Sequence, residues 1–422
     1  MLIEIIIYND KELTKLKKNR LMKVLMLGWE LPPHNSGGLG VACYQLCEAL
    51  AKTEVDLEFI LPYQAEHDIK FMNVLAARPE GVLEILKSGI AYDSYKYVYH
   101  DGHEECKDIY SQAYFYEKAA SDMAKKMSFD IVHAHDWLTF RAALRIKANR
   151  NCPIILHVHS VESDRAGGHR GNPLVHEIEE TAMLQADSVV AVSEHTKKSI
   201  IRDYGIPADK IEVVHNSIDT SHLEALDSNN AYRYLMQLKT NGYKIVSSIG
   251  RLTVQKGITN LLYAAKAVID KMNKTVFLIV GSGEQYNELI ALSAELGIGA
   301  NVVFAGFQRG KEWRDSFAIA DLFLMPSVSE PFGLTPLEAG FYGVPSLISK
   351  QAGVSEVLHS CLKVDFWDID EMANKIVGYL RGDGLRDLLC QQLNNELSGM
   401  SWELSANKIK RLYERHLAGV TA

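Results

Sequence analysis

The sequence of 422 residues lacks the cysteine pattern of a disulfide-rich or zinc-binding protein. Its six cysteines are scattered, and none belongs to a Cys-x-x-Cys pair. A chain of this length does not need disulfides to stabilise its core, so we expect reduced thiols. Cys43 and Cys47 lie four residues apart on one face of an expected helix, but a zinc site needs further ligands nearby. We therefore exclude a small disulfide-stapled module and predict no metal site.

Long apolar runs are also missing. No stretch approaches the ~20 consecutive apolar residues that cross a bilayer, and the first residues lack the basic start and cleavage site of a signal peptide. We therefore expect a cytoplasmic protein without a transmembrane segment. Residues 1–22 are expected to form an N-terminal extension outside the core fold. Its lysines allow peripheral contact with an anionic membrane, although such a run more commonly forms a solvated helix face.

The sequence has no excess of basic residues. Lys and Arg number 45 against 53 Asp and Glu, which gives a net charge of −8. Proteins that bind nucleic acid usually present a basic surface, so this balance argues against duplex DNA or structured RNA as a partner. The length is sufficient for two or three domains. Together these numbers are typical of an acidic, multidomain enzyme.

What the sequence does contain is a repeated unit: a short apolar strand, a glycine-bearing or polar turn, and an amphipathic helix. This pattern predicts parallel sheets covered by helices. A polar stretch near residues 222–242 divides the units into two series, so we expect an α/β protein with two Rossmann-like, doubly wound domains. The predicted strands are residues 24–27, 57–61, 130–133, 154–157, 188–192 and 211–214, then 244–249, 276–280, 302–305, 322–325 and 345–348.

The domain boundaries follow from this division. We predict a first domain over residues 23–238, a second over residues 239–400, and a closing helix over residues 401–418 that packs back on the first domain, with Ser401 as its N-cap. Two such domains that face each other place the carboxyl ends of both sheets along one cleft, where ligands of these sheets bind. The site residues should therefore lie in loops that follow strands.

Two of these loops carry groups suited to phosphate. Gly37 and Gly38 precede a helix, where backbone N–H groups can approach an anion, although an isolated glycine pair more often marks a tight turn with positive φ. Arg251 and Lys256 stand beside glycine turns at a strand end, as contacts to a leaving diphosphate require. Solvated surface charges are the usual alternative for such cations.

The strongest signal is the loop of residues 329–338. Its carboxylates Glu330 and Glu338 are eight positions apart, across a glycine-containing loop that enters a helix. Backbone N–H groups of residues 332–335 can bind phosphate or sugar oxygens, while the carboxylates accept hydrogen bonds from hydroxyl groups. A role as acids of a first helical turn explains one of the two carboxylates but not easily both.

Three motifs, in this order, resemble those of the retaining two-domain (GT-B) nucleotide-sugar glycosyltransferases of families 4 and 5: Gly37-Gly38-Leu39, Arg251 with Lys256, and Glu330-Pro331-Phe332-Gly333-Leu334 with Glu338. Within this group, His133-Ala134-His135-Asp136-Trp137 most resembles glycogen and starch synthases. The resemblance covers roughly residues 22–417. It implies the GT-B fold and a hexosyltransferase activity.

The resemblance implies a donor site. Arg251 and Lys256 would hold the donor diphosphate and stabilise its departure, with backbone contacts from Gly37 and Gly38 of the opposite domain. Glu338 would accept the ribose hydroxyl groups. The backbone of the motif loop would contact sugar and phosphate at Phe332, Gly333 and Leu334.

The resemblance also implies catalytic residues. Glu330 would face the transferred sugar, and His159 would contact the sugar and help to shape its transition state, although a lone histidine at a strand end is more often structural. Asp136 and Trp137 would line the sugar or acceptor pocket. No metal and no cofactor besides the nucleotide sugar are expected, and Asp368-Ile369-Asp370 is interpreted as a set of helix-capping acids.

The expected reaction is transfer of glucose from ADP- or UDP-glucose to the non-reducing end of an α-1,4-glucan, as in glycogen synthases. Synthases that use ADP-glucose commonly carry Lys-x-Gly-Gly-Leu in the first loop, where this chain has Asn35, so the donor stays open. Alternatives are a family 4 enzyme acting on a lipid, a capsule precursor or a small molecule, a sugar-nucleotide epimerase, and a noncatalytic sugar-nucleotide-binding protein. The charged segment 162–169 is either an acceptor-side loop or a mobile surface loop.

Overall fold

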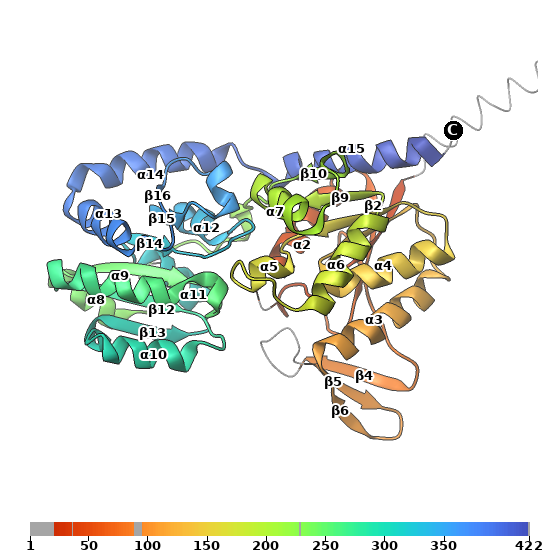
Figure 1. The fold of residues 1–422 in the computed structure, drawn as a ribbon, viewed down its shortest axis with the longest axis horizontal. Coiled ribbons are helices and arrows are strands. Elements are labelled where there is room, and N and C mark those ends of the chain that lie inside the picture. Colours follow the sequence, from red (N-terminus) through yellow and green to blue (C-terminus); the bar gives the residue numbers. More distant parts are fainter. Residues whose placement is uncertain (1–20, 36, 88–94, 228, 421–422) are drawn as a thin grey trace, which may run out of the picture.

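The computed structural model describes residues 21–35, 37–87, 95–227 and 229–420. Two parallel sheets covered by helices form two domains that lie side by side (Figure 1). The predicted α/β architecture of two Rossmann-like domains is thereby confirmed. The expected N-terminal extension lies outside the described residues, apart from its last two positions, of which Met22 already begins the first strand.

The first domain is built on a seven-stranded parallel sheet with the order β10-β9-β8-β7-β1-β2-β3. The strand of residues 22–27 lies inside this sheet and ends in an apolar run because both of its faces are covered, and Leu25, Met26 and Leu27 are fully buried. The strands are β1 (Met22–Leu27), β2 (Val55–Leu61), β3 (Asn73–Ala76), β7 (Ile131–His135), β8 (Ile154–Val158), β9 (Ser188–Ala191) and β10 (Ile211–Val213). The helices are α2 (Gly38–Ala51), α3 (Ile109–Ala124), α4 (Trp137–Asn149), α5 (Glu162–Arg165), α6 (Pro173–Gln185) and α7 (Glu194–Tyr204).

A small antiparallel sheet that the sequence did not predict projects from the first domain (Figure 1). It has the order β4-β5-β6, with β4 (Val82–Lys87), β5 (Tyr95–Tyr99) and β6 (Glu104–Cys106). The buried Tyr95 attaches it to the domain, because its hydroxyl donates to the carbonyl of Trp29 at 3.3 Å and the two rings pack edge to face.

The second domain has a six-stranded parallel sheet with the order β13-β12-β11-β14-β15-β16. The strands are β11 (Lys244–Ile249), β12 (Thr275–Val280), β13 (Val302–Gly306), β14 (Leu322–Met325), β15 (Ser346–Ser349) and β16 (Leu362–Val364). Its longer helices are α8 (Arg233–Thr240), α9 (Ile258–Lys271), α10 (Tyr286–Glu295), α11 (Gly310–Ala318), α12 (Thr335–Phe341), α13 (Ile369–Arg381) and α14 (Asp383–Ser398), and short 3-10 turns include η3 (Val254–Lys256) and η5 (Gly353–Glu356).

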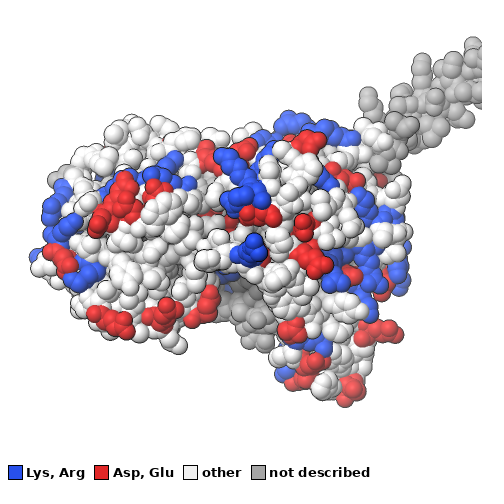
Figure 2. Space-filling model, in the orientation of Figure 1, with Lys and Arg blue, Asp and Glu red and all other residues white. Residues whose placement is uncertain are grey.

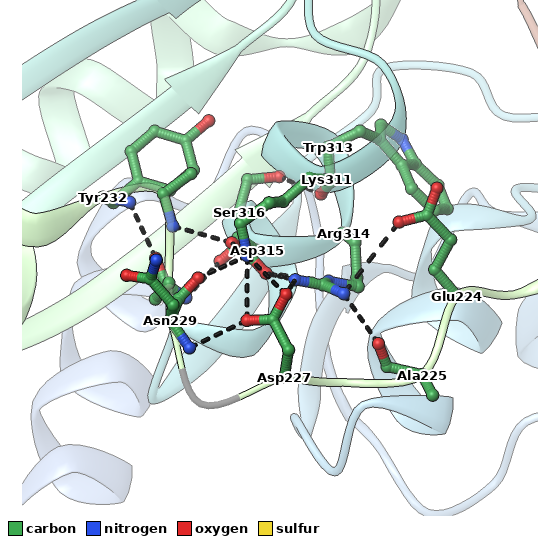
Figure 3. Close-up of polar contacts among 12 residues, drawn as sticks. Glu224, Ala225, Asp227, Asn229, Tyr232, Lys311, Trp313, Arg314, Asp315 and Ser316 are labelled. Atoms are coloured by element: carbon green, nitrogen blue, oxygen red, sulfur yellow. Dashed lines mark hydrogen bonds and ion pairs between the residues drawn. The ribbon is translucent and has the colours of Figure 1, made fainter.

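The polar segment between the two series of units is fixed to α11 by an ionic network (Figure 3). Asp227 lies 2.8 Å from the ammonium of Lys311 and 3.1 Å from the guanidinium of Arg314. These hydrogen bonds, with the N–H of Asn229, hold the pKa of Asp227 well below its usual range. The buried Asp315 contacts Arg314 at 2.8 Å and accepts the N–H of Ala231 at 2.7 Å. The segment is therefore anchored to the second domain.

The last helix, α15 (Trp402–Val420), returns to the first domain and lies above its sheet (Figure 1). Ser401 precedes it and accepts the N–H of Leu404 at 3.4 Å. Ile409 and Tyr413 are buried in the core of the first domain, and the Tyr413 hydroxyl lies 2.5 Å from Nδ1 of His133. The chain thus crosses between the domains twice.

Figure 2 shows acidic and basic side chains interspersed over the drawn face of both domains. Within the part of the chain that the structure describes, no helix combines the length and apolarity that crossing a membrane requires.

Candidate active site

A cleft of about 1190 Å³ separates the two domains at the carboxyl ends of their sheets. Its lining brings together predicted residues from both halves of the sequence: Gly37, Gly38, Asp136, His159, Arg251, Lys256, Glu330, Phe332, Gly333, Leu334 and Glu338. Trp137 is the one predicted site residue outside this lining. It begins α4, is 9% exposed, and packs against the ring of Tyr110 in the first domain.

An ion pair between Lys256 and Glu330 occupies the second-domain wall of the cleft. The Lys256 Nζ atom lies 2.5 Å from Oε2 of Glu330, which also accepts the hydroxyl of Ser327 at 3.0 Å. Gly257 follows Lys256 with φ +66°, and a Cβ there would lie 2.1 Å from the carbonyl oxygen of Pro326. Only glycine fits this position, so the turn fixes Lys256 beside the carboxylate.

The N-terminus of α2 faces the cleft from the first domain. Gly37 is its N-cap and has extended backbone rather than the positive φ of a tight turn. It has no side chain to cap the helix, and within the first turn Glu30 accepts the N–H of Gly40 at 3.3 Å. A Cβ at Gly37 would meet nothing within 4 Å, and one at Gly38 would lie 3.7 Å from Cδ1 of Leu334 in the opposite wall. The two glycines thus leave a helix N-terminus open to an anion such as phosphate.

Glu338 lies on α12 and is partly buried at the cleft wall. Its carboxyl group forms no hydrogen bond or ion pair with another residue of the described ranges, and burial raises its pKa to about 8. An acidic side chain without a polar partner is poised to accept hydrogen bonds from the hydroxyl groups of a ligand.

Four histidines stack on one face of the first sheet and end at the cleft: His133 and His135 of β7, with His157 and His159 of β8 and its end. The ring nitrogens of His135 and His159 lie 3.0 Å apart, and those of His133 and His157 lie 3.2 Å apart. Burial lowers the pKa of all four, to about 3 for His135. His159 is therefore neutral at physiological pH, and its ring is oriented by His135.

Asp136 supports the same edge of the cleft. Its φ of +59° is unusual for a residue other than glycine. Its carboxylate accepts the N–H groups of His159 at 2.7 Å and Ser160 at 3.3 Å. Burial raises the pKa of Asp136 to about 7, although nearby Arg165 and these N–H groups lower it. Asp136 thus fixes the backbone that carries His159.

Among the described residues, three groups of side chains place potential metal ligands within 4.8 Å of one another: Cys43, His135 and His159; His133, His135 and His157; Glu48, Asp219 and His222. The first two belong to the histidine stack, where burial raises the pKa of Cys43 and so disfavours the thiolate that metals bind. In the third, His222 already pairs with Glu48 at 2.8 Å. Asp368 caps α13 by accepting the N–H of Glu371 at 2.9 Å, as predicted.

Sequence reasoning missed the loop after β13. Phe307, Gln308 and Arg309 line the cleft together with Trp313 of α11. The Arg309 guanidinium reaches across to the first domain and donates to the carbonyl of Asn35 at 2.7 Å. The only signal for these residues was their position directly after a predicted strand, which applies to every such loop.

Two family models match the chain, one for each domain. The family described as Glycosyltransferase Family 4 matches residues 36–222, and the family described as Glycosyl transferases group 1 matches residues 236–391. Together they span the cleft residues of both walls.

Curated relatives have similar lengths. An uncharacterized glycosyltransferase of Methanocaldococcus jannaschii is 29% identical over 353 residues, covering 80% of this chain and 83% of the relative. A glycogen synthase of Mycobacterium tuberculosis is 26% identical over 345 residues, covering 80% of both. A D-inositol 3-phosphate glycosyltransferase of Salinispora arenicola is 27% identical over 312 residues, covering 69% of both.

Solved structures share the two-domain fold. A sucrose-phosphate synthase from Thermosynechococcus elongatus superposes with a TM-score of 0.73 at 18% identity, covering 94% of this chain and 100% of that one. The Anabaena protein HepE in complex with UDP-glucose superposes with a TM-score of 0.69 at 18% identity, covering 93% and 100%.

Proposed function

Because the chain is a GT-B glycosyltransferase of families 4 and 5, we propose that it transfers glucose from ADP- or UDP-glucose to the non-reducing end of an α-1,4-glucan, with retention of configuration. One observation carries the proposal. A single cleft combines the Lys256–Glu330 pair, the partnerless Glu338 and the neutral His159 with the open N-terminus of α2.

In this proposal the donor diphosphate lies between the N-terminus of α2 and the cations Arg251 and Lys256. Negative charge increases on the diphosphate as the sugar departs, and fixed cations and N–H dipoles stabilise that charge without reorganising. Glu330 keeps the Lys256 ammonium in one place before the donor arrives, since the two groups are paired at 2.5 Å. Glu338 accepts the ribose hydroxyl groups.

The sugar lies between Glu330 and His159 in the proposed complex. The transition state carries positive charge on the sugar ring, so the Glu330 carboxylate favours it. His159 is neutral because burial lowers its pKa, and it can therefore hydrogen-bond a sugar hydroxyl without adding positive charge. A leaving phosphate oxygen takes the proton of the acceptor hydroxyl, so the proposal needs neither a side-chain base nor a metal ion.

The glucan acceptor is supported by the glycogen synthase relative and by the His135-Asp136 motif beside the cleft. A second candidate is a family 4 reaction with a lipid, a capsule precursor or a small-molecule acceptor. It is favoured by the similar identity to D-inositol 3-phosphate glycosyltransferases and by Asn35, which stands where synthases that use ADP-glucose commonly carry lysine.

The deciding experiment is a donor-by-acceptor screen on the purified protein. ADP-, UDP- and GDP-glucose are offered with glycogen, maltooligosaccharides, inositol phosphate or lipid acceptors, and without acceptor, and both the released nucleotide and the product are measured. Glucan extension supports the main proposal, and turnover only with the other acceptors supports the second candidate. Nucleotide binding without any turnover would support the noncatalytic alternative. Glu330→Gln serves as the inactive control.

A further inference from the structure

Side chains of the first domain hold the backbone on both sides of Glu330. The hydroxyl of Ser329 donates to Oδ1 of Asp164 at 2.5 Å. The carbonyl of Pro331 accepts the hydroxyls of Ser193 at 2.5 Å and Thr196 at 3.3 Å. Glu330 itself belongs to the second domain, so its two neighbours in the chain are bound across the domain boundary. We call residues 329–331 the Glu330 loop.

These contacts are buried. Asp164 is 2% exposed, Ser329 is 8% exposed, and Ser193 is fully buried. The packing is close, because a Cβ at Gly353 would lie 2.1 Å from the Pro331 carbonyl and 2.7 Å from Cβ of Ser193. Asp164 and Ser193 also accept N–H groups within the first domain, from Val161 at 3.1 Å and Thr196 at 3.0 Å. The hydroxyls of Ser329 and Ser193, however, donate across the boundary, and buried hydroxyl groups require such acceptors.

The first-domain partners belong to segments that also serve the cleft. Asp164 lies on α5, which follows His159 directly and lies at the domain boundary (Figure 1). A Cβ at Gly167, just beyond α5, would lie 3.1 Å from Cγ1 of Val254, which begins the turn that carries Lys256. Segment 162–169 therefore forms an interdomain contact, which the sequence did not predict, and its interpretation as an acceptor-side loop stays a prediction.

A third contact fixes the helix that carries Ser193 and Thr196. Glu356 of the second domain accepts the N–H groups of Glu194 and His195, both at 2.8 Å, and contacts Nε2 of His215 at 2.7 Å. Burial alone would raise the pKa of Glu356, but His215 and these N–H groups lower it. An anionic side chain of the second domain thus stabilises the N-terminus of α7.

We propose that Asp164, Ser193 and Ser329 are positioning residues of the transfer reaction, which hold the backbone on both sides of Glu330 while the two domains are closed on each other. Their role in catalysis rests on the proposed function, whereas the contact itself does not. Opening the cleft breaks all three interdomain bonds and leaves the Glu330 loop to its contacts within the second domain, such as the bond from the Glu330 N–H to the Gln351 carbonyl at 3.1 Å. The Glu330 carboxylate is then held from both domains only in the closed protein, where the donor is shielded from water.

The test uses Ser329→Ala, Ser193→Ala and the double variant in the full chain. Each removes a hydroxyl outside the donor contacts proposed for Arg251, Lys256 and Glu338. We expect kcat to fall about tenfold or more, with the donor KM changed by less than about threefold, because positioning acts mainly on the transition state. The matched control is Ser163→Ala, next to Asp164, whose hydroxyl bonds Asp203 at 2.9 Å within the first domain. Its kcat should equal that of the wild type.

A second measurement separates this inference from the proposed function. Small-angle X-ray scattering without any substrate reports how far the domains open. We expect a larger radius of gyration for the double variant than for the wild type or Ser163→Ala, even if no donor is turned over in the screen. The inference is overturned if the double variant keeps the wild-type radius and the wild-type kcat. It is also overturned if thermal stability falls while kcat per folded molecule stays unchanged, which would indicate a merely structural role.

Discussion

The Lys256 ammonium lies 2.5 Å from the Glu330 carboxylate, although the two residues come from loops 74 positions apart in the sequence. The lysine side chain is 21% exposed and the glutamate side chain 8%. This ion pair stabilises the cleft before a ligand binds. It also fixes the direction in which the Lys256 ammonium group points. A diphosphate that enters the cleft therefore meets an oriented cation beside a carboxylate.

The first prediction concerns this pair. Lys256→Ala or Glu330→Gln should lower the transfer rate on the order of 100-fold or more, because in the proposed complex each removes a charge next to the departing diphosphate or the sugar. Initial rates of nucleotide release, with circular dichroism as a check of folding, measure the effect. Lys266→Ala is the control, because Lys266 forms an exposed pair with Asp270 on α9 and should change nothing. Near-normal turnover in Lys256→Ala would contradict the assignment.

The second prediction concerns Glu338. Burial raises its pKa to about 8, so the group is mostly protonated in the empty cleft at pH 7. Ribose hydroxyls that donate hydrogen bonds favour the ionised form and lower this pKa. Nucleotide binding at pH 7 should therefore release close to one proton from this group. Calorimetry in buffers of different ionisation enthalpy measures the release, and Glu338→Gln should abolish it. Equal proton release by both proteins would refute the ribose role.

Much of the fold was predictable because buried parallel strands have a plain sequence signature. The predicted strands 244–249 and 322–325 coincide with β11 and β14, since each contains apolar residues of high strand propensity and is followed by a loop or turn. The cleft followed from the topology, because all these strands end at the same edge of their sheets. Strands with half-exposed faces have a weaker sequence signature. Strand β6, Glu104–Cys106, carries two acids and was missed.

Contacts across the domain boundary could not be predicted. Asp164 and Ser329 are 165 positions apart, and neither residue carries a local pattern that names the other. For Trp137 the sequence motif suggested a place in the sugar or acceptor pocket. In the structure Trp137 is the first residue of α4, and its side chain points into the core of the first domain. A sequence motif gives the types of the residues, but only the packing of the fold decides whether each side chain faces the cleft or the core.

The third prediction concerns the network in Figure 3. Arg314 is 4% exposed, and Asp315→Ala deprives its guanidinium of its buried partner. The substitution also removes the acceptor of the Ala231 N–H group. We expect the free energy of unfolding to fall by about 3 kcal/mol. Asp227→Ala is the matched control. It removes the other acid that contacts Arg314 and Lys311, but its side chain is 51% exposed, so its effect should be much smaller. Urea unfolding measures both, and equal losses would contradict the prediction.

The fourth prediction concerns the histidine stack. Burial holds the pKa of His157 well below its usual value, whereas the unfolded chain takes up a proton there near pH 6.5. Below about pH 6.5 the unfolded state thus binds more protons than the folded state. The contribution of His157 to the free energy of unfolding is therefore complete above that pH and falls as the pH decreases. In His157→Gln, the free energy of unfolding should depend less on pH, by about 1.4 kcal/mol per pH unit near pH 5. Asp136 and Glu338, whose pKa values are raised, act in the opposite direction but equally in both proteins. Urea unfolding of both proteins between about pH 7.5 and pH 5 measures the difference. If His157→Gln kept the wild-type slope, the folded protein would already bind a proton at His157, and the argument for a neutral stack leading to His159 would fail.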